Sequence, residues 1–386
     1  MSNKPRGFQA DQPLDTHQSS LNLHDVLRDP EINKYFRAAV KFNASDIHLK
    51  AGSRPRVRVR GELKNTTSSP LTAESIEQLA FEILTTDQKD YLLTHGSIDF
   101  AHDVDNEHRF RVNVFRQRGQ YSLVGRYVKS VIPSFNDLRL PEVISRIAET
   151  AEAGLILLAG ITGSGKSTTI AAMLEHINAT RSVHIVTIED PIEFVYTDKK
   201  SLVNQREIGI DAPNFAHALR ALMREDPDVV LIGEMRDRET FEAALQAAET
   251  GHLVFGTVHA SSSPQTISRI LDLFEPADRP AIRQNFAFNL QAIICQKLLP
   301  TAKMELGRVP ACEVLLANPV VKKFILDGKD NELPDVIRKH GQEGMVELNE
   351  SIRKLVADGM VDLKTAMEHS PNPEELKMRL KGFTAF

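Results

Sequence analysis

A glycine-rich segment followed by a lysine and two hydroxyl residues (GITGSGKST, 160–168) matches the pattern G-x-x-x-x-G-K-[ST] in full. Such glycines let backbone N–H groups close around phosphate oxygens at the start of a helix. Lys166 would reach the β- and γ-phosphates of a nucleotide, and Ser167 would help to hold Mg²⁺. We therefore predict a nucleotide-binding set of Gly160, Thr162, Gly163, Ser164, Gly165, Lys166, Ser167 and Thr168.

The segments on either side of this loop support the same interpretation. An apolar run (155–159) precedes it and indicates a buried strand, and a helix-compatible run (168–177) follows it. The loop indicates nucleotide binding but leaves the reaction open among kinases, GTPases, transport ATPases and DNA motors. The sequence has no Asn/Thr-Lys-x-Asp motif that reads guanine, which weakens the GTPase interpretation.

Two further apolar runs end in acidic residues. The run 185–188 leads into Glu189 and Glu193, and the run 229–232 leads into Glu234. Ligands of open α/β sheets bind at the carboxyl ends of strands, where carboxylates can hold Mg²⁺ or orient a water molecule. We predict that Glu193 and Glu234 are catalytic, that Glu234 also binds the metal, and that Glu189 contacts the nucleotide. Which glutamate is the general base stays open.

Two histidines flank a third apolar run. His252 precedes LVFGTV (253–258), and His259 follows it. An imidazole beside a γ-phosphate could sense it through a hydrogen bond. We expect His259 to take part in catalysis and His252 to contact the nucleotide. Metal binding by this pair is not expected, because no His or Cys cluster accompanies it in the sequence.

Arginines before the phosphate loop form a separate set of candidates. HRFRVNVFRQR and YSLVGRYV alternate polar and apolar residues, as paired strands do, and they carry Arg111 and Arg126. Phosphoryl transfer gains greatly from a guanidinium delivered across an interface. A second row, Arg54 to Arg60, has no interleaved aromatic residues, which favours a solvated or inter-subunit surface over nucleic-acid binding.

The order of these segments divides the chain into five parts. Alternating patterns in the first third predict an α+β domain, and the continuous apolar runs beyond it predict a parallel sheet in an α/β domain. Prolines mark a linker between them, and amphipathic helices dominate the end. The expected parts are a disordered tail (1–20), an N-terminal domain (21–131), a linker (132–141), a phosphate-loop core (142–314) and a helical C-terminal region (315–386).

Composition excludes several classes of protein. The chain has 386 residues and a net charge of −5, which argues against a general nucleic-acid-binding surface. Its two cysteines, Cys295 and Cys312, cannot form a four-cysteine zinc site and fit a reducing compartment. The apolar stretches are too short to span a membrane, and the N-terminus lacks the apolar core of a secretory signal. We expect a cytoplasmic protein that reaches a membrane through a partner.

Four motifs together resemble those of the secretion ATPase superfamily. GITGSGKST, TIEDPIEFV, the segment ending in DVVLIGE, and ETGHLVFGTVHA are similar to its Walker A, Asp-box, Walker B and His-box motifs. SDIHL, RVRVRGEL and RFRVNVF resemble strands of its PAS-like N-terminal domain. Within the superfamily the sequence is most similar to the PilT-type retraction ATPases of type IV pili. Assembly and type II secretion ATPases typically carry a longer N-terminus and a four-cysteine zinc element.

This resemblance implies a RecA-like P-loop core in a hexameric, ATP-hydrolysing motor for pilus retraction and twitching motility. ATP and Mg²⁺ would bind between the two domains and at the subunit interface. Arg111 and Arg126 would serve as arginine sensors, and His252 and His259 would couple the γ-phosphate to the domain interface. The implied partners are an inner-membrane platform protein of the PilC type and a PilU-like paralogue, with peripheral membrane association and no nucleic acid.

One segment departs from that family's pattern. PilT proteins usually carry a motif near AIRNLIRE that retraction requires, whereas residues 320–327 read VVKKFILD. The hydrophobic spacing is kept, but the arginines and the asparagine are not. The alternatives are therefore an accessory PilU-like motor, a related motor for another filament, and a nucleotide-gated scaffold with weak hydrolysis. A DNA-directed motor has little support in this sequence.

Overall fold

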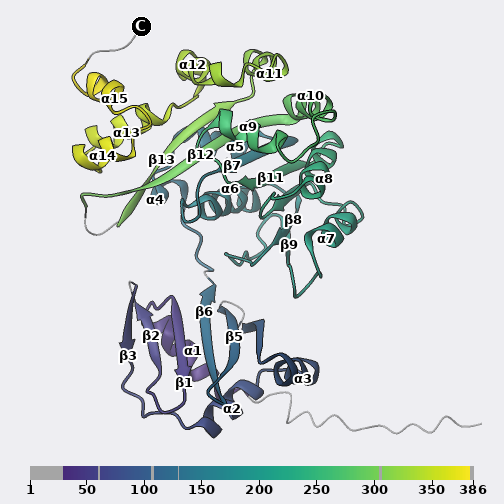
Figure 1. Cartoon of the computed structure of the whole chain (residues 1–386), viewed down its shortest axis with the longest axis vertical. Coiled ribbons are helices and arrows are strands. Elements are labelled where there is room, and N and C mark those ends of the chain that lie inside the picture. Colours follow the sequence, from purple (N-terminus) through teal and green to yellow (C-terminus); the bar gives the residue numbers. More distant parts are fainter. Residues whose placement is uncertain (1–28, 60, 106–107, 129, 304–306, 383–386) are drawn as a thin grey trace, which may run out of the picture. The chain divides into compact units, whose positions relative to one another are not determined.

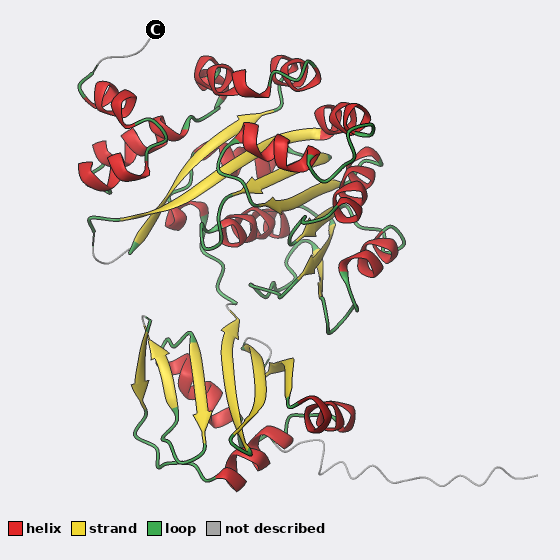
Figure 2. Cartoon of the chain, viewed as in Figure 1, coloured by secondary structure: helices red, strands yellow, loops and turns green. Residues whose placement is uncertain are grey.

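The structure is a computed structural model that describes residues 29–382 except 60, 106–107, 129 and 304–306. The chain divides into two compact units, which are centred on two separate β-sheets (Figures 1 and 2). The expected disordered tail (1–20) lies outside the described residues. Among the residues that are described, no helix combines the length and the apolar character needed to cross a membrane.

The smaller sheet has six strands. Its elements are α1 (Asn33–Lys41), β1 (Asp46–Lys50), β2 (Arg56–Val59), β3 (Glu62–Asn65), α2 (Ala73–Phe81), α3 (Thr86–His95), β4 (Ser97–Asp103), β5 (Arg109–Gln117) and β6 (Gln120–Val128). The strands lie in the order β3–β2–β1–β6–β5–β4, and β1 pairs antiparallel with both β2 and β6. Ile47 and Leu49 of β1 are buried, as are Val112 and Val114 of β5. This period of two confirms the strands predicted from alternation.

The larger sheet has seven strands. They are β7 (Gly154–Ala159), β8 (His184–Glu189), β9 (Leu202–Glu207), β10 (Val229–Ile232), β11 (Leu253–Val258), β12 (Leu290–Pro300) and β13 (Arg308–Leu316). Their order is β13–β12–β7–β11–β10–β8–β9. β13 runs antiparallel to β12, and the other neighbouring pairs are parallel. The four apolar runs predicted as buried parallel strands are confirmed as β7, β8, β10 and β11.

Helices cover both faces of this sheet (Figure 2). Leu155 and Leu157 of β7 pack on one face against Phe241 and Ile267, and Ile156 on the other face packs in a core with α5 and α6. The helices are α4 (Phe135–Leu138), α5 (Glu142–Thr150), α6 (Lys166–Thr180), α7 (Phe215–Leu222), α8 (Arg238–Glu249), α9 (Ser263–Leu271), α10 (Arg279–Asn289), α11 (Pro319–Leu326), α12 (Leu333–Lys339), α13 (Leu348–Ala357), α14 (Leu363–His369) and α15 (Pro373–Leu380), with short 3-10 turns at Asp330–Glu332 and Gly341–Glu343.

Several elements were not predicted from the sequence. β12 (LQAIICQKLLP) contains two glutamines and a lysine, which obscured its apolar pattern. β9 and β13 were also missed. The segment expected as a linker (132–141) contains the short helix α4, which forms because Ser134 and Asp137 cap its first turn reciprocally. Helices α11–α15 occupy the region expected to be helical.

Candidate nucleotide-binding site

The glycine-rich loop joins β7 to α6. β7 ends at Ala159, and α6 begins at Lys166. Between them Gly163 and Gly165 have φ angles of +77° and +89°, in the left-handed region that favours glycine. The chain therefore turns tightly into the helix N-terminus, where backbone N–H groups have no intrahelical partner. These groups can donate to the oxygens of a phosphate.

Lys166 is buried inside this loop, with an exposed fraction of 8%. Its Nζ donates to the carbonyl oxygens of Gly160, at 2.8 Å, and Ile161, at 3.1 Å. Burial lowers the pKa of Lys166, and the negative charge of Glu234 opposes that shift. The ammonium group thus donates to neutral carbonyl oxygens. A phosphate anion would accept a stronger hydrogen bond from it than these carbonyls do.

The remaining loop residues fit a phosphate ligand. Ser164 is buried, and its Oγ has no hydrogen-bond partner among the described residues. Thr162 and Ser167 are exposed, and Thr168 is half-buried. A buried hydroxyl without a partner is costly unless a polar ligand satisfies it. The loop therefore has both the donors and the unmet hydrogen-bonding capacity that a nucleotide phosphate would use.

Glu234 follows β10 after one intervening residue, Gly233, and faces the side chains of His259 and Arg236. Its Oε1 lies 3.0 Å from Nε2 of His259, and it also forms an ion pair with Arg236. Burial disfavours the charged carboxylate, but hydrogen bonding and charge from Arg236, with His259 and Lys166, outweigh burial and lower the pKa of Glu234. Because β7, β11 and β10 are parallel neighbours, Lys166, Glu234 and His259 meet at one edge of the sheet.

Glu189 is the last residue of β8 and Glu193 lies in the loop after it, and the two side chains differ in environment. Glu189 is buried, and its Oε1 accepts hydrogen bonds from Thr187 Oγ1 at 2.8 Å and Gln205 Nε2 at 3.3 Å. Burial raises the pKa of Glu189 to about 7. Its Oε2 accepts from the backbone N–H of Glu193 at 3.4 Å, whereas the Glu193 side chain is exposed. The Glu189 carboxylate thus points inward and holds the turn that carries Glu193. Gln205, which donates a hydrogen bond to this carboxylate, was not predicted from the sequence.

The two histidines lie at opposite ends of β11. His259 follows the strand, whereas His252 precedes it, next to the start of β7 at Gly154. Because the two histidines flank the six residues of β11, they are seven residue steps apart, or about 23 Å at about 3.3 Å per residue. Nδ1 of His252 lies 2.9 Å from the carbonyl oxygen of Ala247, in the last turn of α8. Within one chain, the structure brings His259 and not His252 to Glu234.

Arg111 and Arg126 lie on β5 and β6 of the six-stranded sheet. Nε of Arg126 donates to Oδ1 of Asp46 at 2.9 Å, and Nε of Arg58 lies 3.6 Å from Oδ2 of the same carboxylate. Asp46 is buried, whereas the Arg126 side chain is largely exposed. Asp46 therefore fixes one side of the guanidinium and leaves its outer N–H groups accessible. Sequence reasoning missed Asp46, although it directly precedes the buried Ile47 on a predicted strand.

The site also has oxygen donors suited to Mg²⁺. Within the described part of the chain, no group of three or more His, Cys, Asp or Glu residues is placed to hold a metal ion. Mg²⁺ in nucleotide sites needs fewer protein donors, because waters and phosphate oxygens complete its coordination. Here the Ser167 hydroxyl and the Glu234 carboxylate are the protein oxygens that could supply the rest.

A mostly parallel sheet with a phosphate loop after one strand and an acidic residue after the next strand but one defines a RecA-like P-loop nucleotide-binding protein. Comparison with protein families narrows this class. The family described as "Type II/IV secretion system protein" matches residues 24–368. The chain belongs to that family, as the four motifs predicted.

Individual relatives agree with this assignment. The chain is 40% identical over 344 residues to the type IV pilus retraction ATPase PilT of Pseudomonas aeruginosa, which covers 89% of this chain and 99% of that protein. The type IV pilus ATPase PilU of the same organism is 34% identical over 352 residues, or 91% of each chain. The crystal structure of the pilus retraction motor PilT with bound ADP superposes with a TM-score of 0.82 and 44% identity, over 90% of this chain and 98% of that one.

Proposed function

We propose that this protein is an ATP-hydrolysing motor that drives retraction of type IV pili. The observation that carries the proposal is the meeting of Lys166, Glu234 and His259 at one sheet edge, in a chain whose similarity to PilT covers 89% of its length. In this arrangement Lys166 and the loop bind the phosphates. Glu234 and His259 lie where a γ-phosphate would change their hydrogen bonding, so hydrolysis can be converted into movement.

The motor would act as a homohexamer on a PilC-like platform protein at the cytoplasmic face of the inner membrane, without a nucleic-acid partner. The accessible guanidinium of Arg126 supports this assembly, because phosphoryl transfer gains from an arginine delivered across an interface. Arg111 would act with it as a second arginine sensor. A PilU-like paralogue would be a further partner of the same machinery.

Mg²⁺ would bind through Ser167 and Glu234 and neutralise charge on the phosphates. We assign the general base to the exposed Glu193, because Glu234 already faces cations that make its carboxylate a weak proton acceptor. Glu193→Gln should lower kcat about 100-fold and leave the Mg²⁺ requirement unchanged. Glu234→Gln should instead raise the Mg²⁺ concentration for half-maximal activity. The opposite pattern in a Mg²⁺ titration of the ATPase would reverse the two assignments.

A gene deletion in a piliated strain tests the cellular role. We expect excess surface pili without twitching motility, and we expect Lys166→Ala supplied in trans to leave that phenotype uncorrected. Loss of pili would instead indicate an assembly motor. Normal twitching in the deletion strain would reject retraction as the function.

A second candidate is an accessory PilU-like motor or a nucleotide-gated scaffold. The VVKKFILD sequence of α11 and the similarity to PilU favour it. Steady-state ATPase activity of the purified protein separates these functions. Clear turnover that is lost in Glu234→Ala excludes the scaffold, and retraction that persists through a paralogue after gene deletion identifies an accessory motor.

A further inference from the structure

Gln296 is a buried polar residue in an otherwise largely apolar stretch of β12, with an exposed fraction of 3%. The pairing of β12 with β7 runs up to Cys295 and Ala159. Gln296 is the next residue of β12, at the level where β7 ends and the phosphate loop begins. A buried amide needs hydrogen-bond partners, and the partners of this amide lie in the nucleotide site.

Both ends of the Gln296 amide are bonded across the phosphate loop. Nε2 donates to the carbonyl oxygen of Ser164 at 2.9 Å. Oε1 accepts from Oγ1 of Thr169, in the first turn of α6, at 2.8 Å. The carbonyl oxygen of Ser164 can only accept, which fixes the orientation of the amide. One side chain therefore ties the loop to the first turn of the helix.

The loop glycines are packed against the same residue. A Cβ on Gly165 would lie 2.7 Å from Nε2 of Gln296, and a Cβ on Gly160 would lie 2.6 Å from its backbone oxygen. Both distances are shorter than carbon atoms tolerate. Gln296 is thus in direct contact with two glycines of the motif. Its closeness gives a second reason for glycine at these positions, in addition to the backbone conformation: a side chain would collide with Gln296.

Gln296 is itself held from the opposite side. It pairs in register with Cys312 of β13, whose Sγ lies 3.9 Å from Oε1. The backbone N–H of Cys312 donates to Oγ of Ser351 on α13 at 3.0 Å. The contacts that support the loop therefore continue through β13 to α13 in the C-terminal region.

We propose that Gln296 is a positioning residue of the nucleotide site. It holds the Ser164 carbonyl and the start of α6 so that the loop keeps its phosphate-binding shape before the nucleotide arrives. Loss of the amide lets the loop relax, and the binding of nucleotide must then restore its shape. The inference rests on the nucleotide site of the proposed function and is independent of pilus retraction.

Full-length Gln296→Met tests the proposal, because methionine keeps the length of the side chain and lacks the amide. We expect the dissociation constant of a fluorescent ADP analogue to rise about tenfold, and KM for ATP to rise with it. The kcat at saturating ATP should change by less than about twofold, as expected when binding rather than chemistry is impaired. Gln291→Met, at an exposed position of the same strand, is the matched control and should bind ADP like the wild type.

Thr169 gives a second test that does not alter β12. Thr169→Val removes the hydroxyl that donates to Gln296 and should weaken ADP binding about threefold, whereas Thr169→Ser keeps the hydroxyl and should restore it. The double variant Gln296→Met/Thr169→Val should bind no more weakly than Gln296→Met alone, because the shared bond is already lost.

The outcomes separate this inference from the proposed function. Unchanged ADP affinity in Gln296→Met and Thr169→Val, with only a lower melting temperature, overturns the positioning role. If Gln296→Met does not fold, the ADP affinities of Thr169→Val and Thr169→Ser test the positioning role instead. If the wild type itself does not bind ADP, the proposed function fails instead.

Discussion

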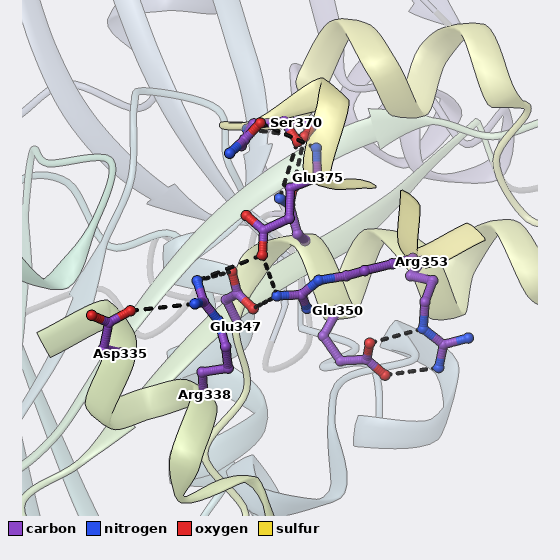
Figure 3. Close-up of polar contacts among 10 residues, drawn as sticks. Asp335, Arg338, Glu347, Glu350, Arg353, Ser370 and Glu375 are labelled. Carbon is purple, nitrogen blue, oxygen red and sulfur yellow. Dashed lines mark hydrogen bonds and ion pairs between the residues drawn. The ribbon is translucent and has the colours of Figure 1, made fainter. Parts of the chain in front are cut away.

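Charged side chains gather in two places around the seven-stranded sheet. At the phosphate-loop edge, Lys166 is buried against backbone carbonyls, and no carboxylate of the described residues lies within ion-pair distance of it. Between the C-terminal helices, Arg379 lies 2.6 Å from Oε2 of Glu347 and 2.5 Å from Oε1 of Glu375. Arg338 contacts the same two glutamates from α12 (Figure 3).

The two regions differ in how completely their charges are paired. In the C-terminal cluster, the half-buried Arg379 and the exposed Arg338 both face carboxylates from separate elements, so the charges help to fix the packing of α12, α13 and α15. At the loop edge, the ammonium of Lys166 and the hydroxyl of Ser164 keep bonding capacity that the chain does not use. The C-terminal cluster brings charges of opposite sign together and helps to hold the fold, whereas the phosphate loop keeps hydrogen-bonding capacity that a ligand could use.

Replacement of Lys166 should have the largest effect, and it should affect activity far more than stability. Lys166→Ala should lower ATPase activity at least about 100-fold, because the phosphates lose their buried cation. The free energy of unfolding should change by less than about 1 kcal/mol, because no residue that the structure describes would lose an ion pair with Lys166. Steady-state ATPase assays and urea unfolding measure the two quantities. A variant that is strongly destabilised but still active would show that Lys166 serves stability and not phosphate binding.

Glu189 lies at the end of the sheet that carries the phosphate loop, yet we expect its side chain to contribute mainly to stability. Its pKa is 4.5 in the reference state and about 7 in the folded chain, so the folded state binds its proton more tightly. The stability this provides is complete below pH 4.5 and is lost as the pH rises to about 7. Relative to Glu189→Gln, the wild type should lose about 3 kcal/mol of unfolding free energy between these pH values. Parallel curves for the two proteins across this range would contradict the prediction.

Arg379→Ala should destabilise the C-terminal cluster by about 2 kcal/mol, because two largely buried carboxylates lose their shorter ion pair and keep the more distant Arg338. Thermal unfolding should show a lower melting temperature, while ATPase activity per folded molecule stays within about twofold of the wild type. A large loss of activity in fully folded protein would show that the cluster contributes to the site.

The ion pair of Arg353 should contribute least to stability. It pairs with Glu350 on one turn of α13 (Figure 3). The two groups are 2.8 Å apart, and both side chains are about one-third exposed. Water screens such a pair, so Arg353→Ala should cost about 0.5 kcal/mol. A cost in urea unfolding equal to that of Arg379→Ala would show that the degree of burial does not distinguish these pairs.

The parts of the site that could be predicted are those encoded locally. The phosphate loop, the acidic strand ends and the four parallel strands follow from spacing within a few residues. Asp46, Gln205 and Gln296 were missed because each acts on a residue from another element, which no local pattern reveals. His252 was grouped with His259 because both flank one strand, but the two ends of a parallel strand open onto opposite edges of a sheet.

The distance along the chain between the phosphate loop and its brace affects how the protein is made. Gln296 lies 132 residues beyond Ser164. At roughly 5–20 residues per second, a ribosome needs on the order of 10 s to reach β12 after synthesising the loop. During this interval β7 lacks its β12 neighbour, and the loop lacks the amide that ties Ser164 to Thr169. A nascent chain therefore completes its nucleotide site only after most of the protein has been synthesised.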